Sequence, residues 1–248
     1  MDQTNGEGLR ALLAAAGDEA LQRFRDPNTE HKSDGSVVTE ADRAAEEVLV
    51  EGLQRLFPDD AIVAEEGARV AGRSRATWHV DPIDGTGAFV GQLAYWGPTC
   101  ARVAPDGGLD LGAFYLPRLG EFWFAARGEG AFRDGQRLRP DNPVDVASDA
   151  ILMVPSRVHR MPDLRWPGKV RSLGSSAAHL AHVAAGGALG ALVPKWALWD
   201  VGCGALLVRE AGRVIWDTAG AAIDAERCTP GLPLLAGAPT VLRVLRTE

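Results

Sequence analysis

The stretch 81–86 gathers the residue types of this chain that most readily do chemistry. Asp81 and Asp84 supply two carboxylates, Gly85 permits a tight turn, and Thr86 adds a hydroxyl. Oxygen ligands of this kind suit Mg²⁺, and two Mg²⁺ ions about 4 Å apart can clamp the attacking and leaving oxygens of a phosphoryl transfer. The pattern predicts a site for hard cations and phosphate, with an ordinary Asp-Gly turn as the competing interpretation.

Acidic residues elsewhere in the chain could complete such a cation site. Glu65 follows the apolar run 61–64, and Asp200 precedes a second apolar run. If 61–64 and the strand that leads to Asp81 are parallel neighbours, their carboxyl ends meet at the crevice where open α/β sheets bind ligands. A solvated strand end for Glu65 and a plain helix N-cap for Asp200 are the alternatives.

Thr86 is expected at a helix N-terminus, where free N–H groups can bind an anion such as phosphate. Its hydroxyl could also orient a water molecule for attack. A simple cap of the helix is an equally favoured interpretation of the local sequence.

Helices and strands ahead of the acidic stretch are predicted from periodicity. Apolar residues at helical spacing predict a first helix over 9–24. Thr39 is a suitable N-cap, with Asp42 as its capping-box partner, for a second helix that ends near Phe57. Short buried strands are expected at 61–64 and 77–80.

The second half of the chain changes its pattern at the proline-rich stretch 139–143. Before it, turn signals between apolar runs predict an antiparallel meander over 95–132. After it, we expect a helix at 175–185, a strand at 188–193, a helix at 200–211 and a strand at 213–216. The sum is a layered α and β fold with a single domain over 1–248, or alternatively two lobes at 1–140 and 144–248.

Composition narrows the function classes. The chain has 248 residues, 46% of them hydrophobic, which is enough for a large core, and its formal net charge of -7 disfavours a nucleic-acid polymer as partner. No apolar run is long enough to cross a membrane, and the N-terminus shows no secretory pattern, so a cytoplasmic location is expected. Cys100, Cys203 and Cys228 are widely spaced and are expected to be reduced and buried.

Two other residue types are assigned to packing. His179 and His182 lie three apart on a predicted helix, a spacing that could bind a transition metal, but no third ligand is near in sequence. Packing is therefore the favoured role for both histidines. The same holds for Trp96, Trp123 and Trp196, of which one could line a substrate pocket.

The segments at 65–66, 81–86 and 199–200 resemble the inositol monophosphatase superfamily of Mg²⁺-dependent, lithium-sensitive phosphatases. Residues 32–42 resemble the mobile lysine loop of that family and the helix start after it, and 171–177 resemble its substrate-side segment. The similarity runs in order from Leu9 to Trp216. It implies a layered αβαβα sandwich, a homodimer, and a small phosphorylated metabolite as the partner, with no membrane and no nucleic acid.

The resemblance also implies roles for individual residues. It assigns Glu65, Asp81 and the carbonyl of Ile83 to a first Mg²⁺, and Asp81, Asp84 and Asp200 to a second, with Glu65 also near a third. Water would attack in line, oriented by Glu65 and Thr86, with Asp42 bonded to Thr86 and no covalent phospho-enzyme. Phosphate and substrate contacts are assigned to Gly85, Thr86, Lys32, Ser172, Gly174, Ser175 and Asp200.

Departures from the family pattern concern the substrate. Val193 stands where the family usually has a substrate-binding glutamate, and Lys195 and Trp196 are unusual for their segment. Residues 197–198 are Ala-Leu instead of the usual Lys-Pro, and 87–89 are Gly-Ala-Phe instead of Thr-Asn-Phe.

These departures leave the substrate open among small phosphorylated polyols, sugars and amino alcohols. Histidinol phosphate and 3′-phosphoadenosine 5′-phosphate are alternative substrates on the same fold. A non-catalytic binding or assembly member is the alternative class.

Overall fold

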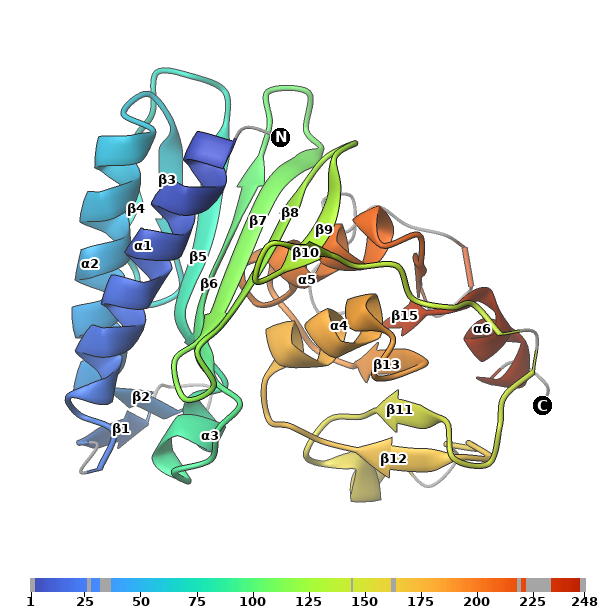
Figure 1. Ribbon diagram of the computed structural model, residues 1–248. Helices are drawn as coiled ribbons and strands as arrows, with labels where there is room; N and C mark the ends of the chain where they lie inside the picture. The colour runs from blue at the N-terminus through green and yellow to red at the C-terminus, as the bar shows by residue number, and fades with distance from the viewer. Residues whose placement is uncertain are drawn as a thin grey trace.

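The computed structural model describes residues 3–25, 28–31, 37–143, 145–161, 164–217, 220–221 and 233–245. In this part of the chain, helices and sheets alternate as stacked layers, with helices on both outer sides and between the two main sheets (Figure 1). This αβαβα arrangement confirms the predicted fold.

The first outer layer consists of two packed helices, α1 (Gln3–Leu21) and α2 (Glu40–Leu56). Thr39 caps α2 with the predicted capping box to Asp42, and the helix ends before Phe57, as the sequence indicates. The first helix ends earlier than predicted, because a tightened turn from Leu21 carries Phe24 into the core. A short ribbon of β1 (Thr29–His31) and β2 (Val37–Thr39) joins the two helices.

The large sheet has the strand order β10-β9-β8-β7-β6-β5-β3-β4. Its strands β3 and β5 are parallel, and the other neighbouring pairs are antiparallel, which confirms the predicted meander. The strands are β3 (Ala61–Ala64), β4 (Arg69–Val70), β5 (Thr77–Asp84), β6 (Gly97–Val103), β7 (Leu109–Leu116), β8 (Glu121–Ala126), β9 (Gly130–Arg133) and β10 (Gln136–Arg137). Strand β5 is longer than predicted, because it continues through Asp81 to Asp84.

The small sheet has the order β12-β11-β13-β15-β14 and is parallel only from β12 to β13. Its strands are β11 (Ile151–Met153), β12 (Lys169–Arg171), β13 (Gly190–Val193), β14 (Val214–Asp217) and β15 (Leu234–Gly237). Helices α4 (Ser176–Ala185) and α5 (Leu198–Glu210) lie between the two sheets, and α6 (Pro239–Leu245) packs on the outer side. The described elements also include α3 (Thr86–Val90) and a short 3₁₀ helix, Val158–Arg160.

Helix α5 is the central element of the core, and small residues let it approach its neighbours closely. A Cβ atom on Gly202 would lie 2.7 Å from the Cβ of Ala101 in β6, and one on Gly204 would lie 2.5 Å from the Cβ of Leu180 in α4. Both distances are too short for a real side chain, so glycine is required at both positions. The buried side chains Cys100 and Cys203 are free thiols in this core, as predicted, whereas Cys228 lies outside the described residues.

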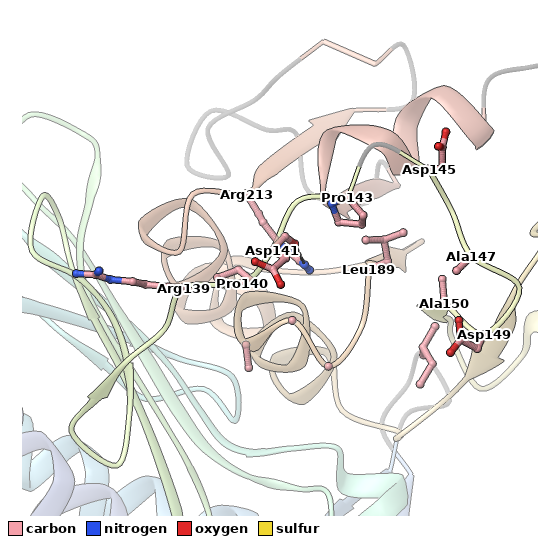
Figure 2. Close-up of a pocket in the computed structure, with 14 residues that line it drawn as sticks. Arg139, Pro140, Asp141, Pro143, Asp145, Ala147, Asp149, Ala150, Leu189 and Arg213 are labelled. Atoms are coloured by element: carbon pink, nitrogen blue, oxygen red, sulfur yellow. Dashed lines mark hydrogen bonds between the residues drawn. The ribbon is translucent and has the colours of Figure 1, made fainter.

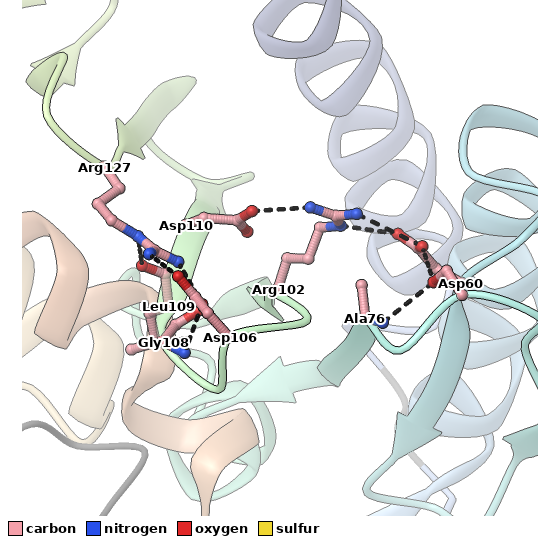
Figure 3. Close-up of polar contacts among 9 residues, drawn as sticks. Asp60, Ala76, Arg102, Asp106, Gly108, Leu109, Asp110 and Arg127 are labelled. Atoms are coloured by element: carbon pink, nitrogen blue, oxygen red, sulfur yellow. Dashed lines mark hydrogen bonds and ion pairs between the residues drawn. The ribbon is translucent and has the colours of Figure 1, made fainter.

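An ion-pair network fastens one end of the large sheet (Figure 3). Arg102 of β6 donates to Asp60, which precedes β3, and to Asp110 of β7, each at 2.7 Å. A second pair, Arg127 with Asp106, closes the turn between β6 and β7 at 2.7 Å. Because Asp60 lies at the amino end of β3, the network leaves the carboxyl end of that strand free for chemistry.

Candidate active site

Two strand ends bring the first acidic residues together. Strands β3 and β5 run parallel with Ala64 opposite Val80, and the N–H of Glu65 donates to the carbonyl of Val80 at 3.0 Å. Glu65 therefore lies beside Asp81, the next residue of β5. The parallel pairing on which the expected meeting of the acids depends is therefore present.

Glu65, Asp81 and Asp200 each place a carboxylate oxygen within 4.8 Å of the other two. Asp200 comes from the first turn of α5, where its carboxylate accepts a hydrogen bond from the N–H of Ala197 at 2.7 Å. The sequence indicated that Asp200 begins the helix or caps it. The structure differs, because the helix begins at Leu198 and its N-cap is Ala197. Its side chain bonds back to the cap residue and still reaches the two strand-end acids.

The electrostatics of this cluster favour a bound cation. Asp81 is only 3% exposed, and burial raises its pKa well above the ordinary value, with further contributions from Glu65, Asp84 and Asp200. Its Oδ1 accepts one hydrogen bond, from the N–H of Ile83 at 2.8 Å. Several carboxylates at this spacing repel one another unless a positive charge lies between them, and their hard oxygen donors fit Mg²⁺.

Asp84 has a different set of partners from the other acids. Its carboxylate accepts a hydrogen bond from the Ser175 hydroxyl, and it also accepts bonds from the N–H groups of Ala177 at 2.7 Å and Ser176 at 3.2 Å. Burial raises the pKa of Asp84 to about 6, although these donors act in the opposite direction. Asp84 thus joins the acidic stretch to the N-terminus of α4 and stands beside, rather than within, the three-carboxylate cluster.

Gly85 and Thr86 form the turn into α3. Gly85 is the N-cap with a φ of 95°, a conformation that favours glycine, and a Cβ there would crowd the Cβ of Ser175 at 3.1 Å. The hydroxyl of Thr86 lies 3.3 Å from Oδ1 of Asp42 and 3.3 Å from the carbonyl oxygen of Ile83. The predicted contact between Thr86 and Asp42 is therefore present in the fold, whereas Thr86 itself is not the cap.

Asp42 is held rigidly behind Thr86. It is 1% exposed, and its Oδ2 accepts hydrogen bonds from the N–H of Thr39 at 2.7 Å and from the hydroxyl of Thr39 at 2.6 Å. Burial raises the pKa of Asp42, while the bonds from Thr39 act against that shift. One oxygen thus anchors the carboxylate, and the other is left to face Thr86.

The structure also reveals a positioning residue that the sequence did not single out. Glu46, on the buried face of α2, accepts hydrogen bonds from the N–H groups of Glu66 at 2.8 Å and Ala68 at 3.0 Å. These bonds fix the turn that carries Glu65. An acidic residue at a core-facing helix position was the signal, because such a residue needs a specific partner when buried.

The predicted substrate-side residues surround the start of α4. Ser175 is the N-cap of α4, Gly174 has a φ of 88°, and the hydroxyl of Ser172 lies 3.2 Å from that of Ser156. Lys32, the other predicted substrate contact, lies outside the described residues.

His179 and His182 serve packing, as predicted. The Nε2 of His179 accepts a hydrogen bond from the N–H of Leu173 at 2.8 Å, and burial lowers the pKa of His179 to about 4. The ring of His182 packs edge-on against Tyr95 and Trp123. The tryptophans Trp96, Trp123 and Trp196 are buried.

A cavity of about 580 Å³ lies elsewhere, beside the connection between the two sheets (Figure 2). It is lined by Arg139, Asp141, Asp145, Asp149 and Arg213, with Arg213 reaching in from the segment before β14. None of the clustered acids lines it, so it is separate from the candidate active site. Among the described helices, none combines the length and apolar character needed to span a bilayer.

Known proteins with similar sequences match most of the chain. The chain is 33% identical over 236 residues to the Nus factor SuhB of Pasteurella multocida, covering 91% of this chain and 86% of the relative. It is also 33% identical over 190 residues to a fructose-1,6-bisphosphatase/inositol-1-monophosphatase of Thermotoga maritima, covering 74% and 72%.

Solved structures match over nearly the whole fold. The extragenic suppressor protein SuhB of Bartonella henselae superposes with a TM-score of 0.87 at 25% identity, covering 98% of both chains. An inositol monophosphatase/NADP phosphatase complexed with Mg²⁺ and phosphate superposes with a TM-score of 0.84 at 23% identity, covering 99% of this chain and 96% of that one.

The family model of the inositol monophosphatases matches residues 4–243, which includes every residue of the acidic cluster. Together with the αβαβα fold and the carboxylates at the ends of β3 and β5, this match decides the class of the protein. The chain belongs to the inositol monophosphatase family and is a phosphoric monoester hydrolase.

Proposed function

We propose that this protein hydrolyses a small phosphorylated polyol, sugar or amino alcohol with the help of Mg²⁺, by direct in-line attack of water. The observation that carries the proposal is the cluster of Glu65, Asp81 and Asp200, whose oxygens lie within 4.8 Å of one another around a buried aspartate. The solved structure of similar fold that holds Mg²⁺ and phosphate supports the choice of ion.

Five residues would hold two or three Mg²⁺ ions. The first ion would take Glu65, Asp81 and the carbonyl of Ile83, and the second would take Asp81, Asp84 and Asp200, with Glu65 also near a third. When bound, Mg²⁺ lowers the pKa of water and neutralises charge on the leaving oxygen. The donor set fits, because it consists of hard oxygens whose mutual repulsion a divalent cation relieves.

The protein groups around this centre would orient and deprotonate the attacking water. Because the Thr86 hydroxyl donates toward Oδ1 of Asp42 at 3.3 Å, its lone pairs remain available to accept a hydrogen bond from the water. Glu65 would accept the proton as general base. Thr39 keeps the second oxygen of Asp42 occupied, so that Asp42 presents one fixed acceptor to Thr86.

The phosphate group would be held by backbone and by the substrate-side residues. The N–H groups of Gly85 and Thr86 stand at the start of α3, where a helix offers them no intrahelical partner. Lys32, Ser172, Gly174, Ser175 and Asp200 are proposed to contact the phosphate or the organic part of the substrate.

The test is phosphate release by Asp81→Asn and Asp200→Asn. Both variants should lose Mg²⁺-dependent turnover by a factor of 10² or more, on the order of removing one electrostatic contact to the transition state. Asp149→Asn, an exposed aspartate at the separate cavity, is the matched control and should keep full activity. Normal turnover by Asp81→Asn or by Asp200→Asn would contradict the proposal that these residues bind Mg²⁺.

The organic half of the substrate is decided by a screen. Phosphate release should be measured with inositol phosphates, histidinol phosphate, fructose bisphosphate and 3′-phosphoadenosine 5′-phosphate, each with and without lithium. Histidinol phosphate and 3′-phosphoadenosine 5′-phosphate are the alternative substrates, and strong preference for either would replace the polyol or sugar assignment.

A non-catalytic binding or assembly role is the second candidate function. It is supported by the relative from Pasteurella multocida, whose name is Nus factor SuhB. Calorimetry with Mg²⁺ and phosphate separates the two. Binding without turnover of any phosphomonoester would support the assembly role. In that case, phosphate release by the Asp81 and Asp200 variants would not differ from that of wild type. Inhibition by lithium, a homodimeric state and a cytoplasmic location are finer expectations from the family resemblance and stay predictions.

A further inference from the structure

A small cavity adjoins the proposed substrate side of the active site. It has a volume of about 160 Å³ and is lined by 155–156, 174–176, 192–195 and His179. Its lining is hydrogen-bonded directly to the acidic stretch. Ser175 and Ser176 line the cavity, and the hydroxyl of Ser175 and the N–H of Ser176 both donate to Asp84. A cavity below the roughly 300 Å³ of a site for a drug-sized ligand has room for one substituent rather than for a whole substrate.

The charge that lines this cavity is positive. Among the described residues that line it, only Lys195 has a formal charge at neutral pH, because His179 is buried and uses its Nε2 as an acceptor for Leu173. None of these described lining residues is acidic, although the protein as a whole carries a formal net charge of -7. Ser156 and Ser176 add further hydroxyl groups to its lining, whereas the hydroxyl of Ser175 already donates to Asp84.

Lys195 is also available to a ligand. Its side chain is exposed, and it makes no ion pair or hydrogen bond with the part of the chain that the structure describes. Val193, two residues before it, is an apolar side chain that is 3% exposed and offers no polar contact to a sugar or polyol hydroxyl. An ammonium group beside an apolar wall and a row of serines matches an anionic group better than a neutral alcohol.

We propose that Lys195 makes this cavity a subsite for a second anionic group, so that the preferred substrate is a phosphomonoester that also carries another phosphate or a carboxylate. This inference rests on the proposed phosphatase function and narrows its substrate class. The scissile phosphate occupies the acidic centre at Asp81, and the second anion lies beyond Ser175 against Lys195.

The test compares substrates that differ only in the second anion. Fructose 1,6-bisphosphate is paired with fructose 1-phosphate, and 3-phosphoglycerate with glycerol 3-phosphate. Wild type should favour the member of each pair that carries two anionic groups, and Lys195→Met should lower the ratio of the two kcat/KM values about tenfold, as expected for one partly exposed charge-assisted contact. Lys195→Arg should retain most of the preference.

Lys169→Met is the matched control, because Lys169 is an exposed lysine on β12 that does not line the cavity. This variant should leave both ratios unchanged. An equal effect of Lys195→Met on both members of a pair, or none, would overturn the subsite while leaving the phosphatase assignment intact.

A binding measurement keeps the two proposals distinguishable if no ester is turned over. Calorimetry with Ca²⁺, a hard cation that uses the same oxygen ligands, gives the affinity for fructose 1,6-bisphosphate and for fructose 1-phosphate. If wild type turns over no ester but binds fructose 1,6-bisphosphate more tightly than fructose 1-phosphate, and Lys195→Met loses this preference, the phosphatase function is rejected and the anion subsite is kept. Equal affinities in wild type and Lys195→Met would reject the subsite.

Discussion

At the residue scale, Asp81 is the point where function and stability oppose each other. Its carboxylate is buried beside Glu65 and Asp200, and burial together with those charges raises its pKa. A raised pKa means that ionising Asp81 is less favourable in the folded protein than in the unfolded chain. The cluster therefore destabilises the metal-free protein and is stabilised when a cation binds.

Asp81→Asn should make the metal-free protein more stable at pH 8. Because the folded pKa of Asp81 lies above the unfolded value near 3.8, the native state holds the extra proton, and stability falls as pH rises through the interval between the two values. The asparagine keeps an oxygen for the N–H of Ile83 and removes the charge. We expect a gain of about 1 kcal/mol, or roughly 2–4 °C in Tm, measured by thermal denaturation in chelator.

The pH dependence supplies the control for this variant. Well below pH 3.8, wild type is protonated at Asp81 in both states, so the difference in Tm between the two proteins should disappear. A gain that is equally large at pH 3.5 and pH 8 would show that packing rather than charge is responsible.

At the element scale, helix α5 carries Asp200 to the site, and its glycines set how deeply the helix sits. Gly202 faces β6 and Gly204 faces α4, each at a distance that admits no side chain. The depth of α5 in turn fixes the distance between Asp200 at its start and the two acids at the ends of β3 and β5.

Gly204→Ala should destabilise the protein by about 1–3 kcal/mol, because a methyl group 2.5 Å from the Cβ of Leu180 overpacks the core. The ordinary helix preference for alanine, about 1 kcal/mol, works in the opposite direction and is the smaller effect. Chemical denaturation measures the change. Gly87→Ala, in α3, is the control and should not lose stability, because no atom beyond its own helix backbone and chain neighbours lies within 4 Å of the new Cβ. An unchanged free energy of unfolding for Gly204→Ala would contradict the packing argument.

The sequence predicted the elements that have strong local signals. The capping box of Thr39 and Asp42, the meander of the large sheet and the two strands before Glu65 and Asp81 all follow from short-range patterns, whereas the parallel pairing of those strands was only assumed. The length of β5 was underestimated, because Asp81 through Asp84 read as a turn whereas antiparallel pairing with β6 keeps Asp84 in the sheet, opposite Gly97.

For the candidate site, the sequence predicted that acidic residues meet, but not how neighbouring elements hold them. The acids were identified by their types and by family resemblance, and three of them meet as expected. The bonds from the start of α4 to Asp84 and from Glu46 to the turn after β3 could not be predicted, because such contacts depend on how distant elements pack. The position of Asp200 inside the first turn of α5 also depends on that packing.

At the scale of the whole molecule, Arg213 holds together the connection between the two sheets. Its guanidinium is buried and donates to the carbonyls of Val183 at 2.7 Å, Ala188 at 2.6 Å and Asp141 at 2.9 Å. Burial lowers the pKa of Arg213 to about 10, which still leaves it charged at neutral pH. One side chain thus satisfies the end of α4, the approach to β13 and the proline-rich stretch at which the sequence predicts a lobe boundary.

Arg213→Met should cost about 3 kcal/mol of the free energy of unfolding, because it leaves buried carbonyl groups without donors. The change is measured by urea denaturation, and the Mg²⁺-dependent activity per folded molecule should be preserved because Arg213 does not contact the acidic cluster. Arg55→Met, at an exposed ion pair on α2, should change stability by less than about 0.5 kcal/mol. Similar effects for the two arginines would contradict the stabilising role of Arg213.

The contact of Asp84 with the start of α4 has a consequence for the order in which the protein folds. The bonded groups are separated by 91 to 93 residues along the chain, and they belong to segments on either side of the proline-rich stretch. Closing so long a loop is slow compared with forming helices and hairpins. A nascent chain that has completed only the large sheet therefore contains most of the acidic residues but lacks Asp200 and the groups that donate to Asp84, so the site is complete only after the second half has docked.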